Sequence, residues 1–330
     1  MSALQVLRGA WRRGVAVVAL SAVTAAMAAC GGSDDDPTLA VKGAVTAEAA
    51  YTVNDVGALT PVTQSVSFSS STGSQSYAFV GPTLWSVLNK AGITLDATRK
   101  NDVLNRYVLA TGSDGYKVAF ALGEIDPDFG NASSLVAYGE VLNGATSYLD
   151  SSTGPFRATA PADTKGGRYV SNLVRLDVRT SGSTAVATSS GVSTTMTVFG
   201  AVKASTIFSA AILASLPVTT VTVGTNVYSG VSLYTLLNTT VGLTLDSTIK
   251  NPSLSMIAVA TGSDGYKAAV SLGEIDPSFG NRPAIVATSV NGAALGSTGD
   301  MRLIVGNDVK QGRSVSNLVA IEVIAAPKAQ

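Results

Sequence analysis

The side chains best suited to chemistry occur twice in the chain, in the same order. The stretch Ala110–Lys117 returns unchanged as Ala260–Lys267. Its aspartate can accept hydrogen bonds, its tyrosine can donate and accept them, and its lysine can bind an anion. The same residues also suit a tight turn, in which the aspartate accepts from its own backbone and the tyrosine packs between strands. The candidates for ligand binding in these two stretches are Asp114, Tyr116, Lys117, Asp264, Tyr266 and Lys267.

Two arginines complete the set of candidates. Arg168 follows Gly-Gly and Arg313 follows Gln-Gly in otherwise similar segments. A guanidinium binds a carboxylate or a phosphate through paired hydrogen bonds, so both arginines favour an anionic ligand. An internal ion pair with the repeated acids is an equal alternative, and both interpretations stay open.

A further pair of acids, Glu124 and Asp126, also returns in the second copy. Two carboxylates could act as a general acid and a general base if one of them had a raised pKa. These two are only two residues apart and Pro127 follows them, so we expect them to brace a turn.

The composition excludes several kinds of active site. The chain has no histidine and only one cysteine. Serine and cysteine nucleophiles activated by histidine, and zinc sites that use imidazole, are therefore excluded.

The N-terminus has the pattern of an exported lipoprotein. Arg8, Arg12 and Arg13 precede an apolar run from 15 to 24, and Met27-Ala28-Ala29 leads to Cys30. The run is too short for a membrane helix, which needs about 20 apolar residues. We predict a signal peptide over 1–29, acylation of Cys30 and a tether over 30–38. The partner would be a lipid bilayer of the bacterial cell envelope, and Gly31 favours the outer membrane.

Removal of the signal peptide leaves 19 basic residues against 22 acidic ones. Nucleic acid is therefore not expected as a partner, because its recognition depends on a basic face.

The repeat defines the organisation of the chain. Similarity extends well beyond the identical block, and its offset of about 150 residues is that of whole domains. We predict one domain over 39–180, a Ser/Thr/Gly-rich linker over 181–195 and a second domain over 196–326.

The local patterns predict an α+β fold in which strands dominate. Apolar residues at helical spacing predict one short helix in each copy, after Thr83 and after Ser232. β-favouring runs predict strands over 107–111, 116–120, 135–138 and 173–178. Asp114-Gly115 suits a tight hairpin turn between the first two of these runs.

Each copy resembles the molybdopterin-binding domain of the sulfite oxidase family across nearly its whole length. In the second copy the matching segments are Gly230–Leu237, Asp264–Tyr266, Leu272–Glu274, Ile285–Ala287 with Asn291-Gly292, Gly299–Leu303 and Arg313–Val323. In the first copy they include Gly81–Leu84 and Gly154–Arg157. The resemblance implies two tandem domains of this fold, an oxidoreductase activity and a molybdopterin cofactor.

Two departures from the family pattern argue against that activity. The stretches that hold the family's metal-binding cysteine correspond to 62–79 and 218–228, and neither contains a cysteine. Where the family commonly has Lys-Trp near the cofactor phosphate, this chain has Ser171-Asn172 and Ser316-Asn317.

We therefore expect a non-catalytic binding or scaffolding module without cofactor, for a small anionic ligand or an envelope protein. Alternatives are a molybdopterin-dependent oxidoreductase with a non-thiolate metal site, and a purely structural or adhesive surface element.

Overall fold

The computed structural model describes residues 36–188 and 191–326. The predicted signal peptide, Cys30 and most of the predicted tether fall outside these residues. The described residues from Pro37 onward form one compact unit. None of the described helices is long and apolar enough to cross a membrane.

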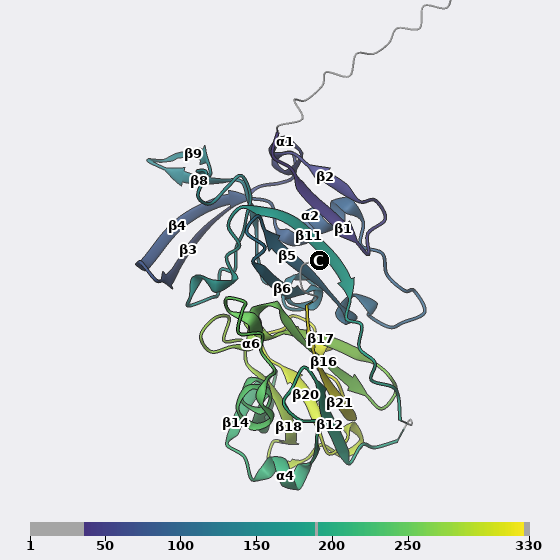
Figure 1. Cartoon of the computed structure of the whole chain (residues 1–330). Coiled ribbons are helices and arrows are strands. Elements are labelled where there is room, and N and C mark those ends of the chain that lie inside the picture. The colour runs from purple at the N-terminus through teal and green to yellow at the C-terminus, as the bar shows by residue number, and fades with distance from the viewer. Residues whose placement is uncertain (1–35, 189–190, 327–330) are drawn as a thin grey trace, which may run out of the picture. The chain divides into compact units, whose positions relative to one another are not determined.

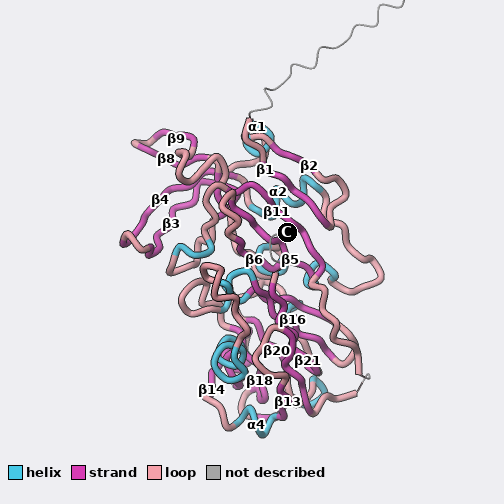
Figure 2. The backbone as a smooth tube through the Cα atoms, viewed as in Figure 1, coloured by secondary structure: helices cyan, strands magenta, loops and turns pink. Residues whose placement is uncertain are grey.

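Strands dominate the described part of the chain, which confirms the predicted α+β class (Figure 2). The first half contains a five-stranded sheet in the order β2-β1-β11-β5-β6, in which β1 and β11 run parallel. Its strands are β1 (Leu39–Gly43), β2 (Ala49–Tyr51), β5 (Arg106–Gly112), β6 (Lys117–Ala121) and β11 (Leu173–Thr180). The predicted strands over 107–111, 116–120 and 173–178 are thus β5, β6 and β11.

The second half repeats this sheet in the order β13-β12-β21-β16-β17, again with one parallel pair. The strands are β12 (Thr195–Gly200), β13 (Thr206–Ser209), β16 (Met256–Gly262), β17 (Lys267–Ser271) and β21 (Leu318–Ala325). Between β11 and β12 the described residues contain no helix or strand. This connection is nevertheless attached to the second half, because the Thr184 N–H donates to Glu322 at 2.7 Å.

Each half has further strands beside its large sheet. In the first half, β3 (Val62–Ser70), β4 (Gly73–Gly81), β8 (Gly139–Leu142) and β9 (Ala145–Tyr148) form one sheet, and β7 (Val136–Ala137) pairs with β10 (Arg157–Ala158). In the second half, the strands are β14 (Val218–Val223), β15 (Asn226–Ser232), β18 (Ala284–Val290), β19 (Ala293–Ala294) and β20 (Arg302–Val305).

The two predicted helices are present with their predicted caps. α2 (Leu84–Ala91) begins after Thr83, whose hydroxyl accepts from the Ser86 N–H at 3.1 Å. α5 (Leu233–Thr235) begins after Ser232 and continues into a π-helical turn over 236–242.

The prediction of only one helix in each copy is wrong. The described residues also form α1 (Val53–Gly57), α3 (Leu122–Ile125), α4 (Ala210–Ala214) and α6 (Leu272–Ile275), besides 3-10 turns over 102–105, 166–168, 252–255, 296–298 and 311–313. Helices of one turn are too short to produce an apolar period in the sequence.

The two halves share a buried interface (Figure 1). Side chains of β5 and β6 pack against side chains of β16 and β17, which come from the other half. The interface cluster consists of Tyr107, Leu109, Ala119, Ala121, Ile257, Val259 and Ala269. Because these strands are covered on both faces, their sequences read as continuous apolar runs.

Two glycines allow the halves to approach closely. A Cβ atom at Gly273 would lie 2.4 Å from the Cδ atom of Arg168, and one at Gly123 would lie 2.7 Å from the Cδ atom of Arg313. The stem of each arginine therefore lies against the one-turn helix of the opposite half, at a position where only glycine fits.

This close approach predicts a large effect of one methyl group. Gly273→Ala should lower the free energy of unfolding by about 1–3 kcal/mol, because the backbone or Arg168 must shift to admit the methyl group. Gly57→Ala is the control, because its Cβ would meet no atom closer than 3.8 Å. Urea unfolding measures both. Equal stability of the two variants would contradict the packing.

Candidate functional site

Arg168 is buried and bonded to carboxylates. Its Nε and Nη2 atoms donate to the two oxygens of Asp163 at 2.9 and 2.7 Å, and its Nη1 atom donates to Glu124. The side chain forms ion pairs with both acids while only 3% of the residue is exposed. Of the two interpretations of Arg168, the geometry is that of the internal ion pair.

Arg313 has the same environment in the second half. Its Nε and Nη2 atoms donate to Asp308 at 2.9 and 2.6 Å, and its Nη1 atom donates to Glu274 at 2.9 Å. Arg282 also contacts Asp308 and Glu274, at 3.0 and 3.4 Å.

Sequence reasoning missed the two aspartates of these clusters. Asp163 and Asp308 each stand five residues before the arginine that they bind, in segments of the form Asp-x-Lys-x-Gly-Arg. The shared spacing was a usable signal, because both copies contain it.

The two charge clusters meet at the interface between the halves. The Ser271 hydroxyl of the second half donates to Glu124 at 2.6 Å. Burial raises the pKa of Glu124, the charge of Arg168 opposes this shift, and the charge of Glu274 adds to it. For Arg168, burial alone would lower the pKa, but Glu124 and Asp163 together raise it. Both arginines therefore stay charged.

The repeated aspartates of the Asp-Gly turns bond within their turns. Asp114 accepts from the Tyr116 N–H at 2.9 Å, and Asp264 accepts from the Tyr266 N–H at 3.0 Å. In each turn only the glycine has a positive φ, 82° at Gly115. The turns therefore differ from the two-residue hairpin in which both central residues have positive φ.

The repeated tyrosines bond across the interface. The Tyr116 hydroxyl donates to the Gly167 carbonyl at 2.6 Å and accepts from Asn251 of the other half at 3.2 Å. Tyr266 makes the equivalent bonds with Gly312 at 2.7 Å and Asn101 at 3.1 Å. Burial raises the pKa of both phenols, so they remain neutral hydrogen-bonding groups.

The neighbouring acids Glu124 and Asp126 have different environments. Asp126 accepts from the Asp128 N–H at 2.9 Å, which is the expected bracing of the turn. Glu124 faces Arg168 instead.

Three of the predicted candidates line one cavity between the halves. Its volume is about 380 Å³, and its walls come from the loop after α2 and from the Asp-Gly turn of the second half. The lining residues are Thr98, Arg99, Lys100, Asp102, Asn105, Asp264, Gly265, Tyr266 and Lys267. We call this cavity the inter-repeat cleft.

The inter-repeat cleft gathers positive charge. The Lys267 ammonium donates to the Ser183 carbonyl at 2.7 Å. Burial lowers the pKa of Lys267; the charge of Glu322 opposes this shift, and that of Arg99 adds to it. Arg99 itself bonds Asp96 at 3.1 Å on the surface. Two cations from different halves are therefore close enough to repel each other.

The corresponding positions in the other copy are different. The offset of 150 residues places Ile249 opposite Arg99 and Pro252 opposite Asp102, whereas Lys250 matches Lys100. The turn that carries Lys117 therefore faces a less charged loop. Burial lowers the pKa of Lys117 as well.

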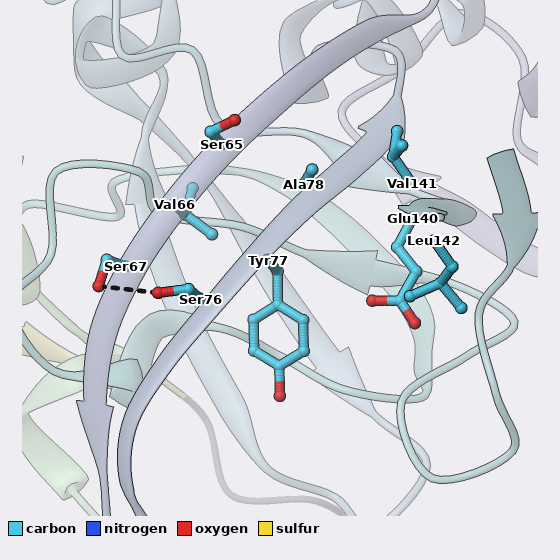
Figure 3. Close-up of a pocket in the computed structure, with 9 residues that line it drawn as sticks. All are labelled: Ser65, Val66, Ser67, Ser76, Tyr77, Ala78, Glu140, Val141 and Leu142. Atoms are coloured by element: carbon cyan, nitrogen blue, oxygen red, sulfur yellow. Dashed lines mark hydrogen bonds between the residues drawn. The ribbon is translucent and has the colours of Figure 1, made fainter. Parts of the chain in front are cut away.

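A second concave site lies beside the β3–β4 hairpin, with a volume of about 680 Å³ (Figure 3). Its wall consists of residues from β3, β4 and β8: Ser65, Val66, Ser67, Ser76, Tyr77, Ala78, Glu140, Val141 and Leu142. We call this site the hairpin groove.

Behind Tyr77 lies an arginine that sequence reasoning did not select. The Arg157 guanidinium carbon lies between 5.2 and 5.9 Å from the ring centroids of four aromatic residues. Those residues are Phe68, Tyr77, Phe79 and Tyr169. Burial lowers the pKa of Arg157, and its Nε atom has no hydrogen-bond partner among the described residues. The counterpart Arg302 has one such ring, that of Tyr228 at 5.7 Å.

The residues in place of the family's thiolate do not fit a molybdenum site. The stretch 62–79 forms β3 and most of β4, and 218–228 forms β14 and part of β15. Their side chains offer hydroxyls, one or two amides and apolar groups, but no sulfur. Within the described ranges no group of three Asp, Glu, His or Cys residues is placed to hold a metal ion.

Comparisons with known proteins give little further guidance. No protein-family model matches the chain, and no curated protein matches it. Among solved structures, the sulfane dehydrogenase SoxCD from Paracoccus pantotrophus is similar with a TM-score of 0.36 and 11% sequence identity. The match covers 89% of this chain and 78% of that chain. A similarity of this size establishes neither a family nor an activity.

The charge clusters predict a pH-dependent loss of stability. Arg168→Met leaves Glu124 and Asp163 buried without their cation, which should cost about 3–5 kcal/mol near pH 8. Burial raises the pKa of both acids above their unfolded values, so folding favours their protonated forms. The deficit should therefore be small below about pH 4 and grow as the pH rises.

The control is Arg99→Met, which removes an arginine that pairs with Asp96 at 3.1 Å where both side chains are exposed. It should leave stability almost unchanged, because an exposed ion pair contributes little. Urea unfolding at several pH values compares the two variants. A deficit of Arg168→Met that does not change with pH would contradict the assignment.

Proposed function

We propose that this protein is a non-catalytic binding lipoprotein of the bacterial cell envelope, anchored through acylated Cys30. Its folded unit binds a small anionic ligand in the inter-repeat cleft. The observation that carries this proposal is the convergence of Arg99, Lys100 and Lys267, from both halves, on one cavity.

In the cleft the acids already have partners, whereas the lysines have no carboxylate partner within the described part of the chain, and this favours an anionic ligand. Asp102 bonds Arg106, and Asp264 accepts from its own turn, so both acids already have partners. Among the described residues, neither Lys100 nor Lys267 forms an ion pair with a carboxylate. A carboxylate or phosphate group in the cleft would relieve the repulsion between Arg99 and Lys267 and accept hydrogen bonds from the cations that line it.

The difference between the copies supports a single binding site. Residues needed for the common fold recur in both halves, whereas Arg99 is replaced by Ile249 at the equivalent position. A ligand that requires Arg99 would bind only the cleft that contains Tyr266 and Lys267.

The buried acids and the tyrosine hydroxyls already have bonding partners within the protein, which supports a role without catalysis. The buried acids of the two clusters are bonded to arginines, and the tyrosine hydroxyls donate to backbone carbonyls. A general base needs a free carboxylate or imidazole within reach of its substrate. The chain has no histidine, and its acidic candidates are engaged.

Arg157 supports a second candidate function. A buried guanidinium whose Nε atom has no hydrogen-bond partner among the described residues suits the phosphate of a pterin cofactor, which the sequence resemblance implies. Stoichiometric molybdenum and pterin in protein from a cofactor-competent host would favour this oxidoreductase over the anion-binding module.

The proposed function predicts saturable binding of inorganic phosphate or citrate to the full-length protein. Lys100→Met combined with Lys267→Met should weaken binding at least tenfold, and increasing salt should weaken it further. The matched control is Lys250→Met combined with Lys117→Met, the pair at the equivalent sequence positions of the opposite copies.

Isothermal titration calorimetry measures all three proteins. The control should bind the anion as tightly as the wild-type protein does. Binding that both double variants weaken equally, or no saturable binding to the original protein, would refute the assignment to this cleft.

A further inference from the structure

The hairpin groove arises because β4 is longer than its neighbour β8. β4 pairs with β3 along all nine residues, from Gly73 to Gly81. With β8 it pairs only at Phe79 and Val80. The part of β4 from Gly73 to Ala78 therefore has a partner strand on one side only. The groove includes Ser76–Ala78 of this stretch, together with residues of β3 and β8 (Figure 3).

The hairpin register determines which backbone groups face the groove. The hairpin closes on the pair Ser70 and Gly73, and Tyr138 N–H donates to the Val80 carbonyl at 3.0 Å on the β8 side. Backbone groups of alternate residues face the same side of a strand. Ser76, four residues before Val80, therefore directs its N–H and C=O toward the groove.

The second half has no equivalent open edge. There β15 pairs with β18 from Tyr228 to Ser232, and the Asn291 N–H donates to the Val227 carbonyl at 2.8 Å. The corresponding hairpin strands are six and seven residues long. The open edge is thus a feature of the first copy alone.

The groove lacks the usual protection against strand addition. Exposed edges in proteins are commonly guarded by lysine, proline or a bulge. The hairpin from Val62 to Gly81 contains no charged residue and no proline. Its exposed face carries small polar side chains such as Ser67 and Ser76, which contact each other at 3.4 Å.

One charge lines the groove, and it is negative. The Glu140 carboxylate lies on the same side of the sheet as the Tyr77 ring, and the two side chains flank the groove (Figure 3). Glu140 forms no ion pair with a described residue. No lysine or arginine lines the groove. The charge of Glu140 acts on the buried Arg157, but among the described residues the two form no ion pair, so a cation from outside can pair with this carboxylate.

We propose that the hairpin groove binds an extended segment of a partner protein, which adds as a strand to the open edge of β4. The segment carries a lysine or arginine that pairs with Glu140 beside the Tyr77 ring. Backbone hydrogen bonds to Ser76 supply affinity, and the basic side chain supplies specificity. This surface is separate from the inter-repeat cleft, and the two proposals can fail independently.

The test selects binders from a display library of random heptapeptides against the purified full-length protein. Selected peptides should be enriched in lysine or arginine and in β-branched residues. A synthetic peptide from the selection should bind Glu140→Gln at least fivefold more weakly, with reduced salt dependence.

Two proline variants distinguish strand addition from other contacts. Ser76→Pro removes the N–H that faces the groove but no hydrogen bond to β3, and it should weaken peptide binding at least tenfold. Thr63→Pro is the matched control, because Thr63 lies directly opposite Val80, its N–H faces the other edge of the hairpin, and it does not line the groove. The control should bind the peptide as the original protein does.

Three outcomes would overturn the proposal. One is a selection that yields no binders or no basic residues. Another is peptide binding that both proline variants weaken equally. The third is a concentration-dependent dimer of the original protein that Ser76→Pro abolishes, because the occupant would then be a second copy of this chain.

Discussion

The structure depends on two arginines that each complete a charge cluster in their own half while packing against the other half. The stem of Arg168 lies where Gly273 has no side chain, and its guanidinium bonds Asp163 and Glu124. Arg313 does the same against Gly123. A buried carboxylate without a cation is costly, so each cluster is stable only when it is complete. The interface thus constrains both halves at once.

Because of this constraint, a residue that is identical in both copies is not thereby identified as a ligand-binding residue. Ligand-binding residues and interface residues are equally expected to recur, but here the recurring arginines, tyrosines and glycines bond or pack between the halves. Thr164 N–H donates to the Phe279 carbonyl at 3.1 Å, and Val309 N–H donates to the Phe129 carbonyl at 2.7 Å. The contacts are reciprocal, as in a symmetric dimer made from one chain. Recurrence therefore identifies the interface, and the differences between the copies identify the places where function is expected.

Both proposals rest on such differences. The inter-repeat cleft has Arg99 where its counterpart has Ile249. The hairpin groove exists because β3 and β4 are longer than β14 and β15, and because β8 leaves β4 after two pairs. A duplicated framework lets one copy change its surface while the interface keeps the stability of the whole.

The sequence was sufficient for features that depend on neighbours along the chain. α2 was predictable because Thr83 caps a run with apolar residues at helical spacing, and β5 and β6 were predictable from β-favouring runs around Asp114-Gly115. The sequence could not show which acids meet Arg168, because Glu124 is 44 residues away in the chain. It also could not show that β8 diverges from β4, since strand register depends on tertiary packing.

The most direct test of the account is whether the two halves unfold together. Trp85 is the only tryptophan outside the predicted signal peptide, so its fluorescence reports on the first half. Hydrogen exchange of the β16 and β21 amides reports on the second half. Because the interface couples the two halves, both probes should give the same urea midpoint and the same free energy of unfolding. Two separate transitions, with the second half stable after Trp85 has become exposed, would contradict it.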